Sequence, residues 1–284
     1  MHSTLFRSTR LILPALLAAV LLPGILPAHP DPSHTLEHLE EHLAETPDDP
    51  ELLRQKADLL LSAGHPDLAR PVVTRLLELE PKQQKNLLLD ARISRVKKEE
   101  GTLPKASALV AAHPKFAAGW LFLAHVERDA GHKDEAVTAM RKALDLTVKP
   151  SPTDVLTCAA WLEESGDKAG AVAVLDQGLA KIGVLAGLHQ KAIELEITIG
   201  QHDSALRRVD ALAARFRPSV DLSIQRASIL EKAGRFKEAS ESCDSALALM
   251  QAMPASRKTG PAWKAQFEAV NQRKVKNIER AATN

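Results

Sequence analysis

The residues from Trp120 to Ala143 read WLFLAHVERDAGHKDEAVTAMRKA, a stretch that predicts two helices joined by one tight turn. Gly131 stands near its middle, and Ala136 follows five residues later. A glycine after a helix suits the left-handed backbone that often ends a helix, because it has no side chain to clash. An alanine on the next helix lets the two helices approach closely where they cross. The stretch therefore predicts a helical hairpin.

The same glycine and alanine recur along the chain at a nearly fixed spacing. Six glycines are separated by 37, 30, 35, 34 and 34 residues, and an alanine follows each of them by five. The glycines are Gly64, Gly101, Gly131, Gly166, Gly200 and Gly234, and the alanines are Ala69, Ala106, Ala136, Ala171, Ala205 and Ala239. A single hairpin cannot bury its apolar face, so hairpins repeated with this period are expected to stack against each other.

This pattern resembles the tetratricopeptide repeat (TPR), whose 34-residue signature includes a large residue, Leu-Gly, alanine, an aromatic residue and a closing proline. The first stretch matches through Trp120, Leu123, Ala124, Gly131, Ala136, Met140 and Ala143. An earlier one matches through Leu53, Ala57, Leu60, Gly64, Ala69, Val73, Leu76 and Pro81. Later units follow through Ala171, Leu175, Ala205, Val209, Ala239, Cys243 and Ala246. The resemblance covers about residues 47–250 and implies an all-α, right-handed superhelical solenoid of about six repeats.

The second unit, from about Gln84 to His113, is less regular than the others. Its glycine, Gly101, comes late, which predicts a long first helix, and Pro114 cuts the second helix short. We therefore expect a bend or imperfect stacking at this unit.

Two helices outside the repeat array, which we place at residues 50–252, are predicted to cap its ends. Within residues 29–49, a helix from His34 to Glu45 carries an apolar stripe of Leu36, Leu39 and Leu43 and stands as a half-repeat. Residues 253–284 form a loop and a last helix that begins at Pro261. Its apolar side is predicted to hold Trp263, Phe267, Val270 and Ile278, and its basic side Lys264, Arg273, Lys274, Lys276 and Arg280.

The first residues predict export from the cell. Arg7 and Arg10 precede an apolar run over residues 11–26, and a small residue, Ala28, follows as a cleavage site. The run is shorter than a membrane-spanning helix and is interrupted by prolines, so cleavage is favoured over stable membrane insertion. The mature protein would begin at His29 and lie in the periplasm or outside the cell.

Charge and composition exclude several classes of function. After signal removal 35 of the 37 basic residues remain against 36 acidic residues, a balance that argues against nucleic acid as a partner. The chain shows no glycine-rich phosphate loop and no Ser-His-Asp or Cys-His arrangement, so we predict no enzymatic activity. The two cysteines, Cys158 and Cys243, are predicted to be buried free thiols, because two repeats separate them.

The predicted N-terminal helix also offers a candidate metal site. His34, His38 and His42 are spaced one turn apart on the face opposite its leucines, so they point to solvent. Imidazoles at this spacing can hold Zn²⁺ or Cu²⁺, but a solvated polar face that happens to use histidine is the simpler explanation. No other cofactor is predicted.

In proteins of the TPR family, partners usually lie in the concave groove formed by the first helices of the repeats. The resemblance places the following residues in that groove: Glu51, Arg54, Asp58, Leu121, His125, Arg128, Leu156, Glu163, Gln190, Glu194, Ile224, Ser228 and Glu231. It implies an exported scaffold that binds a partner protein there. Two alternatives stay open: a metal-handling protein that uses the histidine helix, and a stabilising subunit with no specific groove ligand.

Overall fold

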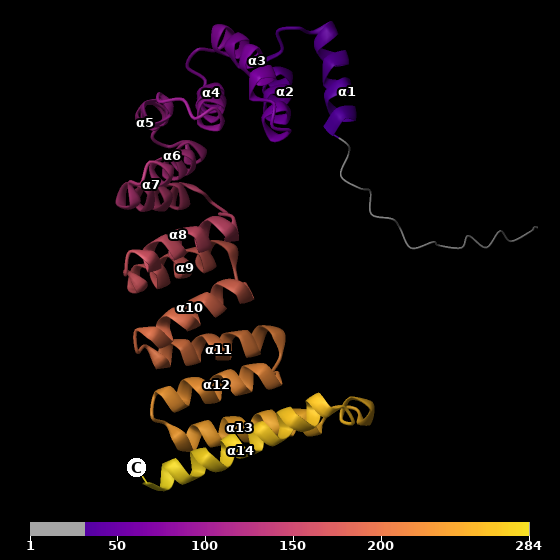
Figure 1. Ribbon diagram of the computed structural model, residues 1–284, viewed down its shortest axis with the longest axis vertical. Helices are drawn as coiled ribbons and strands as arrows, with labels where there is room; N and C mark the ends of the chain where they lie inside the picture. Colours follow the sequence, from indigo (N-terminus) through magenta and orange to yellow (C-terminus); the bar gives the residue numbers. More distant parts are fainter. Residues whose placement is uncertain (1–31, 284) are drawn as a thin grey trace, which may run out of the picture.

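The computed structural model of the protein describes residues 32–283. Over this range the chain forms fourteen α-helices and one 3₁₀ turn, and none of these residues lies in a strand. Figure 1 shows the helices as a long stack that starts at α1 and ends at α14. The predicted signal peptide, residues 1–28, lies outside the described residues.

Six hairpins of helices, which we number one to six in chain order, make up the stack. The first helices, which we call A helices, are α2 (Pro50–Ser62), α4 (Gln84–Val96), α6 (Ala117–Asp129), α8 (Pro152–Glu164), α10 (Ala186–Thr198) and α12 (Val220–Lys232). The second helices, the B helices, are α3 (Pro66–Leu79), α5 (Thr102–Ala112), α7 (Lys133–Leu146), α9 (Lys168–Ile182), α11 (His202–Phe216) and α13 (Phe236–Gln251). The predicted all-α solenoid of about six hairpins is confirmed.

A residue with a left-handed backbone closes the turn of each hairpin. In five hairpins it is the predicted glycine, with φ between 74° and 89°: Gly64, Gly131, Gly166, Gly200 and Gly234. In the first turn, the backbone N–H of His65 donates to the carbonyl of Leu60 at 2.8 Å, and that of Gly64 donates to the carbonyl of Leu61 at 3.1 Å. These bonds satisfy carbonyl groups that the end of the helix leaves open.

The alanines that follow the turns are buried inside the stack, as predicted. All six of them are fully inaccessible to solvent. Gly178 in α9 shows how closely the helices of a hairpin approach, because a Cβ atom there would lie 2.6 Å from Cγ1 of Val155 in α8. Small residues at these places are therefore needed for the hairpins to close.

The turn of the second hairpin differs from the prediction. Gly101 has an ordinary φ of −74° and precedes α5, so it does not close α4. Lys98 takes the left-handed conformation instead, with a φ of 55°, and the N–H of Glu99 donates to the carbonyl of Ser94 at 2.9 Å. The chain thus turns three residues earlier than Gly101 indicates, and residues 99–101 lengthen the connection to α5.

The predicted long first helix of this hairpin is also wrong, because α4 has 13 residues like every other A helix. The prediction of a short second helix is correct. Helix α5 has 11 residues, whereas the other B helices have 14 to 16. Pro114 shortens its end as predicted, and its late start shortens it further. Figure 1 shows the stack changing direction between α3 and α6, where the bend was expected.

Helix α1 (Pro32–Glu45) covers the first hairpin with the predicted stripe. Leu39 is buried, and Leu36 and Leu43 pack against the core of hairpin one. Asp49 then caps α2, because its side chain accepts hydrogen bonds from the backbone N–H groups of Glu51 and Leu52. The apolar stripe and the cap together fix the start of the array.

Helix α14 (Pro261–Thr283) covers the other end, after a 3₁₀ turn at Ala255–Arg257. Trp263 and Phe267 stack with ring centroids 5.0 Å apart, and Val270 is buried. Ile278, predicted on the same side, is 50% exposed, and Asn277 is buried in its place. The residues of α14 that face hairpin six are spaced by four, three and seven positions, from Trp263 through Phe267 and Val270 to Asn277. Position 278 therefore lies off this face.

Two of the predicted basic residues of α14 do not face solvent freely. Arg273 donates to both carboxylate oxygens of Glu231, at 2.8 and 2.7 Å, and Lys274 pairs with Asp244 at 2.7 Å. Asn277 adds a third bond to Glu231, also at 2.7 Å. Glu231, predicted in the groove, therefore fastens the terminal helix to hairpin six.

The two cysteines are buried free thiols, as predicted. Cys158 lies in α8 and Cys243 in α13. Burial raises the pKa of the Cys158 thiol to about 11 and that of Cys243 in the same direction. Both therefore stay protonated near neutral pH and behave as small apolar residues.

We expect Gly166→Ala to lower the free energy of unfolding by about 1 kcal/mol, because alanine is strained at the φ of 89° that this turn requires. Gly187→Ala is the matched control, since Gly187 lies exposed in α10 with no atom near its missing Cβ. That variant should be as stable as the parent or gain up to about 1 kcal/mol. Urea unfolding followed by circular dichroism measures both, and equal effects of the two substitutions would contradict the account of the turn.

Candidate interaction groove

The residues predicted to line the groove recur at matching places on successive A helices. The fifth residue of an A helix always precedes the left-handed residue of its turn by ten. This fifth place holds Arg54, Leu121, Leu156, Gln190 and Ile224. One turn later stand Asp58, His125, Glu194 and Ser228, and after a further turn Arg128 and Glu163. These places form one face of the stack, which we call the A-helix face.

Polar pairs join consecutive A helices across this face. They are Asp58 with Arg92, Arg95 with Asp129 at 2.7 Å, Arg128 with Glu164, Glu163 with Lys191 at 2.7 Å, and Gln190 with Gln225 at 3.0 Å. Several of the predicted groove residues therefore already have partners within the chain. Pairs between exposed side chains contribute little stability each, but together they fix how neighbouring hairpins are placed.

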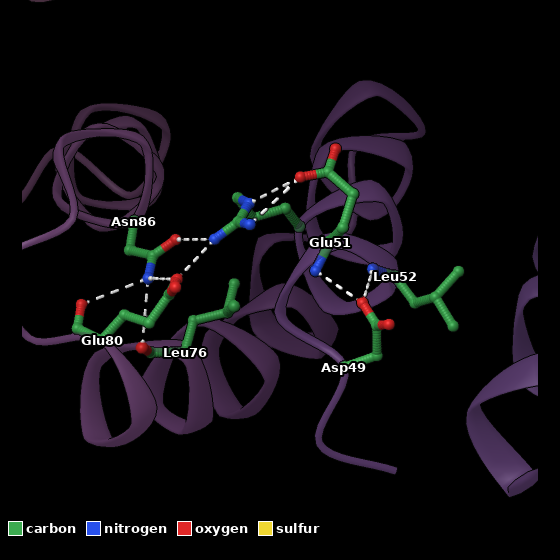
Figure 2. A network of polar contacts seen from close by, with 7 residues as sticks. Asp49, Glu51, Leu52, Leu76, Glu80 and Asn86 are labelled. Carbon is green, nitrogen blue, oxygen red and sulfur yellow. Dashed lines mark hydrogen bonds and ion pairs between the residues drawn. The ribbon is translucent and has the colours of Figure 1, made fainter. Parts of the chain in front are cut away.

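Arg54 is the predicted groove residue most deeply engaged inside the protein, and Figure 2 labels its partners Glu51, Glu80 and Asn86. Its guanidinium donates to Glu80 at 2.6 Å and to the side-chain oxygen of Asn86 at 3.3 Å, and it pairs with Glu51 at 3.1 Å. Asn86 is fully buried and donates in turn to the carbonyl of Leu76 at 3.1 Å. With its side chain only 13% exposed, Arg54 joins hairpin one to hairpin two and has little surface left for a partner.

An aromatic cluster fills the boundary between α6 and α8. His125 meets Trp161 edge to face with ring centroids 5.6 Å apart, and the guanidinium of Arg128 lies 5.3 Å from the Trp161 ring. Burial and the nearby charge of Arg95 lower the pKa of His125. His125 is therefore neutral near pH 7 and adds no charge to the face.

A pocket of about 330 Å³ opens between α4 and α6. Its apolar lining consists of Leu88, Val96, Ala118, Leu121 and Phe122, and its polar lining of Arg92, Arg95 and His125. No carboxylate is among these lining residues. The pocket can therefore take an apolar side chain beside two guanidinium groups, each of which also pairs with an aspartate outside the lining.

Sequence reasoning found Leu121 and His125 in this pocket but missed Leu88, Arg92 and Arg95. The miss follows from placing the second turn at Gly101. Counting back ten residues from Lys98, the true turn residue, reaches Leu88, in register with Leu121. A lysine at position 98 does not mark a turn in the sequence. Only the assumption that α4 has the same length as the other A helices would have placed the turn there.

The other predicted residues lie along the face but outside this pocket. Leu156 is 37% exposed, and Ile224 and Ser228 are half-buried on α12. Glu194 is exposed and lies 4.0 Å from Lys191. The structure thus gathers two of the predicted residues at one hollow and spreads the rest over a longer surface.

The candidate metal ligands are only partly described. His38 and His42 are exposed, and their ring centroids lie 4.8 Å apart. The side chain of His34 lies outside the described part of the protein. Among the side chains that are described, no group of three histidine, cysteine or acidic residues is arranged to hold a metal ion.

Comparisons with known proteins agree with this architecture. Residues 117–147 and residues 191–254 match sequence models of the tetratricopeptide repeat. The chain is a tetratricopeptide-repeat protein. TPR proteins are generally non-catalytic scaffolds, so the family suggests a role in protein–protein interaction. No curated protein matches the sequence significantly.

Several solved structures match the chain at low sequence identity. The C-terminal part of a TPR repeat-containing protein from Cytophaga hutchinsonii matches with a TM-score of 0.53 and 12% identity, covering 78% of this chain and 92% of that one. MamA residues 41 to the end from Desulfovibrio magneticus RS-1 match with a TM-score of 0.42 and 23% identity, covering 52% and 84%. The thermophilic TPR protein TTC0263 from Thermus thermophilus matches with a TM-score of 0.40 and 22% identity, covering 64% and 99%. Within residues 32–283, no helix of this TPR protein is long and apolar enough to span a bilayer.

The fifth TPR has a charged interior. Glu196 of α10 is 1% exposed, and Arg208 of α11 donates to it at 2.9 Å and to Asp176 of α9 at 2.7 Å. The matching place in repeats one, four and six holds Leu60, Leu162 and Leu230. Burial raises the pKa of Glu196, and the bond from Arg208 opposes this rise. The ion pair of repeat five therefore stands where repeats one, four and six have a buried leucine.

We expect Glu196→Ala to lower the free energy of unfolding by about 3 kcal/mol, because Arg208 keeps its charge and loses its buried partner. The double variant Glu196→Leu with Arg208→Met should be at least as stable as the parent, because it places a leucine where repeats one, four and six have one. Thermal unfolding followed by circular dichroism compares the variants. A double variant less stable than the single one would show that the ion pair itself stabilises the repeat.

Proposed function

We propose that this protein is an exported adaptor that holds a segment of a partner protein in a concave groove formed by its A-helix face. The observation that carries this proposal is the pocket between α4 and α6. It combines apolar side chains with two arginines, Arg92 and Arg95, whose partners Asp58 and Asp129 are more than half exposed and lie outside the pocket lining.

The arrangement suits a polypeptide partner for two physical reasons. The stacked hairpins and the pairs between their A helices hold the surface in one shape, so binding loses little conformational entropy in the protein. An apolar side chain that enters the pocket would be anchored by burial, and the arginines would select an acidic group next to it. Anchor residues in pockets surrounded by polar contacts are typical of protein interfaces.

Export is part of the same proposal. It is supported by the basic residues, apolar run and small residue of positions 1–28, which precede the first described helix. An exported adaptor would meet its partner in the periplasm or outside the cell, after signal cleavage at Ala28.

A cross-linking experiment on intact cells tests both parts. A membrane-impermeant cross-linker should join the tagged protein to a discrete partner, and the purified chain should begin at His29. Ala118→Glu should reduce the cross-linked product at least about fivefold, because it places a charge in the pocket from an exposed position on α6. Val148→Glu, at an 89% exposed position between α7 and α8, should leave it unchanged.

Two results would contradict the proposal. Equal cross-linking by the Ala118→Glu and Val148→Glu variants would show that the pocket is not the site. A chain that still begins at Met1 and reacts with no impermeant reagent would show that it is not exported.

The contact between His38 and His42 favours a second candidate function. Their exposed rings are close enough to share one metal ion, with His34 one turn before them, so we also propose a periplasmic Zn²⁺ or Cu²⁺ handling role. In this case the helix would capture the ion and the repeats would present it to a partner.

Calorimetric titration of the mature protein with Zn²⁺ and Cu²⁺ tests the metal role. It predicts a dissociation constant below about 100 μM that weakens at least tenfold in the variant His38→Ala with His42→Ala. His65→Ala, on the α2–α3 turn, is the control and should bind as the parent does. Binding weaker than about 100 μM in the parent would end this alternative.

A further inference from the structure

The pocket between α4 and α6 continues into a second, larger hollow. This hollow of about 680 Å³ lies toward the turns of the second and third hairpins, and Arg95 and Val96 line both. Its apolar lining includes Leu103 and Val126. The two hollows together form one furrow along the boundary of α4 and α6, which we call the α4–α6 furrow.

The unusual turn of hairpin two produces the second part of the furrow. Residues 99–101 delay the start of α5, and Glu99, Glu100 and Thr102 line the hollow that results. Val96 stands between the two parts and is 55% exposed, although it is apolar. An exposed valine flanked by two hollows is a place where burial by another molecule would be favourable.

Side-chain contacts cross the other boundaries between A helices, beginning with the pair of Asp58 and Arg92 between α2 and α4. Trp161 fills the one between α6 and α8, the pair of Glu163 with Lys191 crosses the next, and Gln190 with Gln225 crosses the last. The α4–α6 furrow is crossed only by Arg95 and Asp129 among the polar pairs described, and their side chains are 39% and 58% exposed. Such an exposed pair contributes little, so a carboxylate from a partner can replace Asp129 beside Arg95.

The direction of the furrow determines what fits it. Its lining residues run from Ala118 on α6 to Ala130 just after the helix, which corresponds to about 18 Å along the helix axis. On both helices they recur every three or four residues, the spacing at which a third helix lying alongside presents its own side chains. An extended strand would also bring unpaired backbone groups against Leu88, Leu121 and Phe122, which offer no hydrogen bonds, whereas a helix pairs its own.

We infer that the α4–α6 furrow receives an amphipathic helix of about three turns from the partner protein. Its apolar residues, at positions i, i+3 or i+4, and i+7, enter the two hollows on either side of Val96, and an acidic residue beside the central one pairs with Arg95. This inference rests on the proposed adaptor function, because it names the form and chemistry of the partner at that site.

Selection from a library of random 16-residue peptides displayed on phage tests the inference with the mature protein as bait. The enriched peptides should share the apolar spacing and an acidic residue near its centre. The best of them, made synthetically, should gain helical circular dichroism on binding. A proline at its central apolar position should weaken binding at least tenfold in fluorescence anisotropy.

Variants of the protein locate the bound peptide. Val96→Glu should weaken binding at least tenfold, and Arg95→Ser should weaken it for the acidic peptide but not for a version with glutamine in place of the acid. Val184→Glu, at a 46% exposed position in the loop before α10, is the matched control and should bind as the parent does. Circular dichroism melting of each variant confirms that it is folded.

The possible failures can be told apart. Enriched peptides that tolerate the central proline, or that bind Val96→Glu normally, would overturn the helix in the furrow. If those peptides lose binding with Leu156→Glu instead, the groove still binds a polypeptide and the adaptor proposal stands. If the parent protein enriches no peptide more strongly than the Val96→Glu variant used as bait, this inference is overturned. The adaptor function is then tested separately by the cross-linking experiment.

Discussion

The close approach of two helices at a buried alanine is the constraint on which the rest of the structure depends. Each B helix carries this alanine one turn after its start. The left-handed residue between the helices reverses the chain direction, so that the alanine lies against the A helix. Neither helix of a hairpin could bury its apolar side alone, so each hairpin packs against the next one. The terminal helices α1 and α14 complete the burial at the two ends.

Stacking of this kind leaves the same face of every A helix at the surface. Along most of that face, polar side chains of neighbouring hairpins pair with each other, which fixes the geometry but occupies the groups. The second hairpin interrupts this regularity. Because its turn comes at Lys98 and α5 starts late, the boundary of α4 and α6 stays open and exposes apolar side chains such as Val96. The irregular repeat, rather than the regular ones, therefore carries the candidate site.

The fold was predictable from the sequence because its main determinants are local. Glycine at a left-handed turn and alanine at a helix crossing leave a periodic mark, and five of the six glycines hold the predicted conformation. Gly101 misled because a lysine can also take the left-handed backbone, at a modest cost that tertiary packing offsets. The candidate site was less predictable. Arg54 has the right place in its repeat but is held by Glu80 and Asn86, and such long-range pairing leaves no periodic mark.

The central claim is that the hairpins lie side by side in an elongated stack instead of gathering around one common core. Small-angle X-ray scattering of the chain from His29 to Asn284 tests this most directly. A compact domain of that length would have a radius of gyration of about 18 Å. The stack predicts a clearly larger radius and a pair-distance distribution with a long tail. A radius near the compact value with a symmetric distribution would contradict the account.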